Sequence, residues 1–113
     1  MHARLAALAA RIEADPAALG AVRDEGDALA ETADDDDDAV LRWRIAVVRA
    51  VMAAPPDGDA VRELYGELVD RYRDRPPLLA RLRPLGDEIR RREADGTLPR
   101  SMVARSSRRP PRR

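Results

Sequence analysis

The sequence predicts an all-α fold: a four- to five-helix bundle with short connections, followed by a disordered basic tail. Apolar residues recur at steps of three and four along most of the 113 residues, and no segment alternates apolar and polar residues over the length of a strand. The composition changes after residue 96, where Arg, Pro and Ser replace the periodic pattern. We therefore expect one helical domain over residues 1–96 and a flexible tail over 97–113.

The first predicted helix carries Leu5, Leu8 and Ile12 on one face and ends near Asp15. The pair Asp15-Pro16 is typical of the start of a second helix. Proline fits the first helical turn, and the aspartate side chain accepts hydrogen bonds from amides that have no other partner.

Five consecutive aspartates, residues 34–38, separate the second predicted helix from the third. The apolar stripe of the second helix consists of Leu19, Val22 and Leu29. Gly20 and Gly26 lie inside this helix, where each is expected to cost about 1 kcal/mol relative to Ala. The aspartates lead into the most apolar segment, residues 39–54. Because carboxylates there meet unpaired amides and the positive end of the helix dipole, the run also predicts a helix start.

Proline and glycine separate the remaining predicted helices. The segment 55–58 ends the third helix, and we expect Asp59 to cap the fourth. The stripe of the fourth helix consists of Val61, Leu64, Tyr65, Leu68, Val69 and Tyr72. The fifth helix follows residues 76–77 and is either kinked or divided in two at Pro84, because proline removes an amide and disfavours helical geometry in the residue before it. Its buried face consists of Leu78, Leu82, Leu85 and Ile89, and Gly96 is expected to end it.

Charge is balanced overall but unevenly distributed. The chain has 21 Arg against 21 Asp and Glu, with a net charge of −8 over residues 1–40, +2 over 41–96 and +6 over 97–113. It has no Cys, Lys, Phe, Asn or Gln, and His2 is its only histidine. This composition excludes a disulfide scaffold, thiolate or multi-histidine zinc sites, and Cys/His or Ser/His/Asp nucleophiles. We predict neither a metal ion nor a cofactor.

The sequence also predicts a cytoplasmic protein without membrane contact. No apolar run approaches the ~20 residues that a membrane-spanning helix needs. Arg11 and Glu13 interrupt the short apolar run at residues 5–10 before the core of a signal peptide could form. Because the bundle holds few large side chains and small domains are marginally stable, we expect a homo-oligomer or an obligate partner.

The aspartate run invites a metal interpretation, which we do not favour. A D-x-D-x-D pattern begins at Asp34, but Ala39 stands where a calcium loop needs Gly, and Ile45 stands where it needs a bidentate Glu. Consecutive carboxylates on one backbone also point in different directions. The preferred interpretation is a solvated helix start.

Arg44 and Trp43 are the candidates for partner contact. Arg44 lies in the middle of the apolar stripe predicted for the third helix, with Trp43 beside it. Because an unpaired buried charge is costly, Arg44 must form a structural salt bridge, extend to the surface or anchor a partner. Trp43 suits core packing, yet Trp and Arg are also the residue types enriched at binding hot spots. The structural and the partner-binding interpretations both stay open for these two residues.

Other groups in the fourth helix have simpler interpretations. Tyr65 and Tyr72 are expected at the edge of the core with their hydroxyls in water, and no basic and aromatic residues interleave there to form a base-stacking platform. The carboxylates on its polar side are Glu63, Glu67, Asp70 and Asp74. They alternate with arginines, so we expect no cleft with a perturbed carboxyl group and no enzymatic activity. A helix-turn-helix is disfavoured, because residues 75–77 include two prolines and no Asn or Gln is present to read adenine.

Arginines gather toward the C-terminus and form a candidate contact for phosphates or an acidic partner. They are Arg90, Arg91, Arg92, Arg100, Arg105, Arg108, Arg109, Arg112 and Arg113. Such a segment binds phosphate backbones without base specificity, docks on an acidic protein face, or folds back onto residues 34–38 of its own chain. For the first three, the negative end of the fifth helix is a sufficient structural explanation.

These observations predict a non-enzymatic accessory or adaptor protein that acts through protein–protein contacts, including contacts with itself. The alternative is a nucleic-acid-associated protein that binds phosphate backbones through its arginine-rich C-terminus. Nothing in the sequence indicates a small-molecule substrate.

Overall fold

The computed structural model describes residues 3–53 and 57–98, and within these ranges the chain contains helices and no strand. The elements are α1 (Ala3–Ala14), the 3-10 turn η1 (Pro16–Ala18), α2 (Leu19–Thr32), α3 (Asp38–Ala53), α4 (Gly58–Arg71), α5 (Pro76–Arg81) and α6 (Arg83–Asp95). None of these helices combines the length and the apolar composition needed to cross a membrane. The predicted all-α class is confirmed. Most of the predicted tail, residues 99–113, lies outside the described ranges.

Aspartates stand at the start of η1, which leads into α2, and at the start of α3. The side chain of Asp15 accepts a hydrogen bond from the amide of Ala17 at 3.3 Å, at the Asp-Pro start that the sequence predicts. At the start of α3, Oδ1 of Asp37 accepts a hydrogen bond from the amide of Ala39 at 2.8 Å. Each carboxylate pairs with an amide that has no partner inside its helix, which is why both helices begin where they do.

The prediction that Asp59 caps α4 is wrong. Asp57 is the cap: its backbone is extended, and its side chain accepts a hydrogen bond from the amide of Ala60 at 3.1 Å. A capping side chain reaches amides two or three residues ahead, so the aspartate just before the helix does this work. Asp59 is already helical, in the first turn, and forms an ion pair with Arg62 at 3.4 Å.

The predicted fifth helix is divided in two. α5 ends at Arg81, and α6 begins at Arg83 with Pro84 in its first turn. A first-turn amide has no partner within the helix, so the missing amide of proline costs little there, whereas inside a helix it breaks a bond. The buried face of the predicted helix still crosses the break through Leu82, Leu85 and Ile89.

α6 ends in a Schellman motif around Gly96, the position where the sequence expects the helix to stop. Gly96 has φ of 78°, its amide donates to the carbonyl of Glu93 at 3.2 Å, and the amide of Thr97 donates to the carbonyl of Arg92 at 3.0 Å. The chain then folds back so that Leu98 is buried in the core. The predicted boundary after residue 96 therefore falls just before a core residue.

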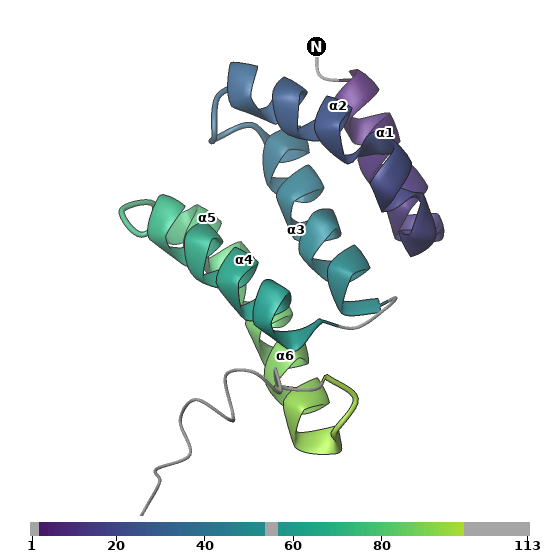
Figure 1. Ribbon diagram of the computed structural model, residues 1–113. Coiled ribbons are helices and arrows are strands. Elements are labelled where there is room, and N and C mark those ends of the chain that lie inside the picture. The colour runs from purple at the N-terminus through teal and green to yellow at the C-terminus, as the bar shows by residue number, and fades with distance from the viewer. Residues whose placement is uncertain (1–2, 54–56, 99–113) are drawn as a thin grey trace, which may run out of the picture.

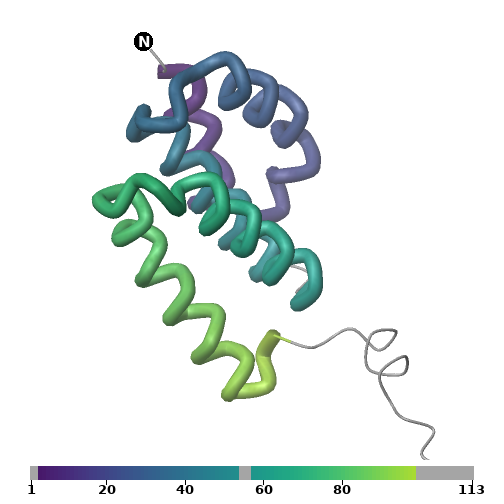
Figure 2. Tube along the Cα trace, turned by 90° about the vertical axis from the view of Figure 1, so that its left-hand side faces the viewer, coloured from purple at the N-terminus to yellow at the C-terminus, as the bar shows by residue number. Residues whose placement is uncertain are grey.

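α3 lies between two groups of helices, with α1 and α2 on one side and α4 to α6 on the other (Figure 1). The residues of α3 buried in the first core cluster, with α1, η1 and α2, are Val40, Trp43, Ala46, Val47 and Ala50. Those buried in the second cluster, with α4, α5 and α6, are Leu41, Val48 and Met52. A helix with apolar residues on both sides is typical of a buried element, which explains why this segment is the most apolar of the chain. Figure 2 shows that the chain reverses after α4, so that α5 and α6 return at an angle to it.

α2 comes close to α3 at Gly26. This glycine is buried, and a Cβ built on it would lie 2.0 Å from an indole carbon of Trp43. Carbon atoms in contact are normally ~3.5–4.0 Å apart. The glycine that the sequence marks only as a weak point of the helix is therefore what allows α2 to pack on Trp43.

Candidate functional site

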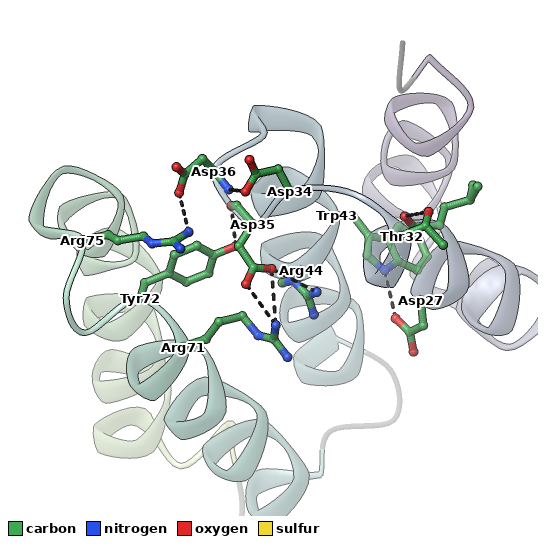
Figure 3. Close-up of polar contacts among 11 residues, drawn as sticks. Asp27, Thr32, Asp34, Asp35, Asp36, Trp43, Arg44, Arg71, Tyr72 and Arg75 are labelled. Carbon is green, nitrogen blue, oxygen red and sulfur yellow. Dashed lines mark hydrogen bonds and ion pairs between the residues drawn. The ribbon is translucent and has the colours of Figure 1, made fainter.

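The acidic segment between α2 and α3 meets α3 and α4 through Asp35. Its carboxylate forms ion pairs with Arg44 of α3 at 3.5 Å and with Arg71 of α4 at 3.2 Å. Its backbone carbonyl accepts a hydrogen bond from the hydroxyl of Tyr72 at 3.0 Å (Figure 3). One loop residue thus joins the segment before α3 to the middle of α3 and to the end of α4.

The neighbouring aspartates pair with arginines that lie just before α5 and at its end. Asp36 forms an ion pair with Arg75, and Asp38 pairs with Arg81 at 2.6 Å. The predicted solvated helix start is thus also a set of long-range ion pairs. The only sign of these ion pairs in the sequence is a surplus of arginines near the end of the fourth helix. That surplus does not indicate which aspartate pairs with which arginine. Within residues 3–53 and 57–98, no group of three or more His, Asp or Glu side chains is arranged to hold a metal ion.

Arg44 occupies a partly buried position at the junction of α3, α4 and the acidic segment. Its side chain is 14% exposed, and Nε and Nη2 are buried without a hydrogen-bond partner among the described residues. Two guanidinium groups, those of Arg44 and Arg71, share the single carboxylate of Asp35. This trio therefore carries one positive charge in excess, close to the core. The structural salt bridge expected for Arg44 is present, and its role in partner contact stays a prediction.

Trp43 points away from Arg44 into the first core cluster (Figure 3). The indole is fully buried, and its Nε1 donates a hydrogen bond to Oδ1 of Asp27 at 2.9 Å. Trp43 therefore has the core-packing role that is one of the two interpretations of the sequence. The contact of Trp43 with a partner stays a prediction. The folded chain leaves no surface of the indole exposed.

A cleft of about 220 Å³, here called the central cleft, opens between α2 and α4 with α3 beneath it. Its apolar lining consists of Val47, Val48, Leu64 and Leu68. Its charged lining consists of Arg23, Asp27 and Glu31 from α2, Arg44 from α3, and Glu67 and Arg71 from α4. Arg44 thus borders a concave surface that combines an apolar base with charged walls, a combination typical of binding pockets.

The environment of Tyr72 differs from the prediction. The sequence places its hydroxyl in water, whereas the structure buries the whole side chain under the acidic segment, where the hydroxyl donates to Asp35. Burial raises the pKa of Tyr72 above its usual 10.0, because it disfavours the charged phenolate. The negative charge of Asp35 raises this pKa further, and the positive charges of Arg44 and Arg71 oppose the shift.

This raised pKa predicts loss of stability in alkali. The folded state holds the Tyr72 proton more tightly than the unfolded state, so its contribution is complete below about pH 10 and falls as the pH rises toward the pKa of the folded state. The chain has no Lys or Cys to titrate in the same range. Urea midpoints measured from about pH 9 to 11 should fall in the native chain and in Tyr65→Phe. In Tyr72→Phe this fall should disappear, and a slope that persists there would contradict the assignment.

A second concave surface, here called the lateral groove, lies on another side of α4, between α4, α5 and α6. It has a volume of about 460 Å³. Its residues are Tyr65, Val69, Pro76, Leu79, Ala80, Arg83 and Arg90. The sequence assigns Tyr65 and Val69 to the buried stripe of the fourth helix, but both stay partly exposed. The division of the fifth helix into α5 and α6 leaves this part of the stripe incompletely covered.

The predicted phosphate-binding arginines are only partly within the described residues. Arg90 pairs with Asp87, Arg92 lies 3.6 Å from Glu88, and Arg91 is exposed. The others lie outside the described ranges: Arg100, Arg105, Arg108, Arg109, Arg112 and Arg113. Contact of these residues with phosphates or with an acidic partner stays a prediction.

No protein-family model, curated protein or solved structure matches this chain.

Proposed function

We propose that this protein is a non-enzymatic accessory or adaptor protein, and that Arg44 anchors a protein partner, or a second copy of the chain, at the central cleft. The observation that carries the proposal is the environment of Arg44: its guanidinium group is 14% exposed, shares the carboxylate of Asp35 with Arg71, and leaves two of its nitrogens without a hydrogen-bond partner among the described residues, beside an apolar surface. A carboxylate supplied by a partner would pair with this guanidinium group more fully than the shared Asp35 does. Arginines in such partly desolvated positions are enriched among the residues that dominate binding energy.

Charge favours a protein partner over nucleic acid for the folded part of the chain. Residues 3–53 and 57–98 contain 15 Arg and 21 Asp and Glu, a net charge of −6. Phosphate backbones would be repelled by this part, so nucleic-acid binding would depend on the C-terminal arginines alone. We place the proposed function in the cytoplasm, and self-association is one of its forms.

Replacing Arg44 with Leu tests the proposal. The variant should remain folded, because Arg71 still neutralises Asp35 and leucine suits the apolar surroundings. Loss of an anchor should cost about 2 kcal/mol or more of binding, a ~30-fold weaker complex. We would measure partner recovery from native extracts by quantitative affinity purification, and self-association by sedimentation.

Arg42→Leu is the matched control, because Arg42 lies on the same helix in an exposed pair with Glu13. It should retain partner binding. A folded Arg44→Leu variant that recovers the same partners and associates as strongly as the native chain would contradict the proposal. So would a large fall in melting temperature, which would make Arg44 a purely structural residue.

A further inference from the structure

We propose that the lateral groove is a second docking surface, and that it takes an amphipathic segment of a partner protein whose apolar side chains are flanked by Asp or Glu. The groove lies on a different side of α4 from the central cleft and shares no residue with it. The two surfaces can therefore be occupied together, which is what an adaptor requires, and each can be tested alone.

The apolar base of the groove is formed by side chains that the fold leaves incompletely covered. Tyr65 and Val69 of α4 and Leu79 of α5 are all partly exposed, whereas Leu82 and Leu85 nearby are fully buried in the core. Tyr65 extends toward α6, since its hydroxyl would lie 2.4 Å from a Cβ at Gly86. Its ring is thus held between α4 and α6 as a wall of the groove. Covering this surface would remove apolar area from water, which favours binding.

The rim of the groove is positively charged. Arg83 and Arg90 both line it and are seven residues apart on α6, which places them two helical turns, or about 10 Å, apart on the same side. Arg83 is exposed and has no ion-pair partner among the described residues. Arg90 pairs with Asp87 one turn before it, in a pair that is exposed to water. Such a rim attracts acidic side chains and repels basic ones.

This charge decides between the candidate occupants. The C-terminal segment of the chain has apolar residues at Met102 and Val103, but residues 97–113 carry six arginines and no acid, so the rim repels it. The acidic helices of a second copy, α1 and α2, already bury their apolar residues in the first core cluster. An acidic amphipathic segment of another protein satisfies both the apolar base and the charged rim.

A random peptide library displayed on phage, selected on the full chain, tests this proposal. The selected sequences should combine large apolar residues with Asp or Glu. A synthetic peptide from the selection should bind Arg83→Glu about fivefold to tenfold more weakly than the native chain, in fluorescence anisotropy. A glutamate in the first turn of a helix is favourable, so Arg83→Glu should keep α6 intact. Val69→Asp should weaken binding at least as much.

Arg11→Glu is the control for charge alone, because Arg11 is exposed on α1, far from the groove in the fold, and has no ion-pair partner among the described residues. It should bind the peptide like the native chain, as should Arg44→Leu, whose effect is confined to the central cleft. Selected sequences that are basic, or that share no pattern, would overturn the proposal. Equal weakening by Arg11→Glu and Arg83→Glu would also overturn it, because binding would then follow net charge rather than the groove.

Discussion

Replacing Gly26 with Ala should destabilise the protein by about 2 kcal/mol, although Ala is the better helix former. A Cβ at this position would lie 2.0, 2.3 and 2.4 Å from three carbon atoms of the Trp43 indole. The indole is fully buried and hydrogen-bonded to Asp27, so it cannot move aside without disturbing the first core cluster. The steric cost therefore exceeds the gain of ~1 kcal/mol in helix propensity. Urea unfolding followed by circular dichroism measures the difference.

Gly66→Ala is the matched control. Gly66 is exposed within α4, and a Cβ there would meet no atom within 4 Å, so this variant should gain about 0.5–1 kcal/mol. Combining Gly26→Ala with Trp43→Leu should cost less than the sum of the two single changes, because the smaller side chain leaves room for the Cβ. A Gly26→Ala variant as stable as the native chain would contradict the packing of α2 on Trp43.

Replacing Asp35 with Asn should lower the free energy of unfolding by about 1–2 kcal/mol. The change preserves the size of the side chain and the backbone carbonyl that accepts the Tyr72 hydroxyl. Among the residues that the structure describes, it removes the only carboxylate paired with Arg44, whose side chain is 14% exposed, and with Arg71. A charge held largely out of water without a counter-charge is costly, which is the source of the expected loss. Thermal and urea unfolding both report it.

Asp36→Asn, one residue further along, provides the comparison. The side chain of Asp36 is 61% exposed, and exposed ion pairs contribute about 0–1 kcal/mol, so its loss should be small. Adding Arg44→Leu to Asp35→Asn should restore stability, because the unpaired buried charge is removed with the arginine. Equal stability of the Asp35→Asn and Asp36→Asn variants would refute the view that Asp35 holds a buried cation.

The helix limits were predicted well where one short-range rule had one solution. Asp15 beside Pro16 and Gly96 after a periodic segment act on amides and carbonyls a few residues away, and the structure confirms both. Where a rule allowed two solutions, the prediction was wrong or left open. Asp57 and Asp59 both suit a cap, and Pro84 permits either a kink or a break. The extended backbone of Asp57 decides the first case, and the end of α5 at Arg81 decides the second.

The candidate site also has one part that the sequence predicts and one part that it does not. That Arg44 needs a counter-charge follows from the cost of burying an ion beside apolar residues, whatever the fold. Asp35 supplies this counter-charge because the acidic segment lies over the end of α4. The same position of the segment buries the Tyr72 hydroxyl. No periodicity or spacing in the sequence contains this contact, which joins residues 37 positions apart.

The amino-acid order is enough to establish that this chain is helical, where most of its helices begin and end, and how its charge is distributed. Those properties follow from interactions between residues close together in the chain, which are present in any fold. Packing alone decides that α3 is covered on two sides, that Gly26 admits the Trp43 indole, and that the central cleft and the lateral groove exist. These features arise from contacts between distant segments, which are made only when the helices come together.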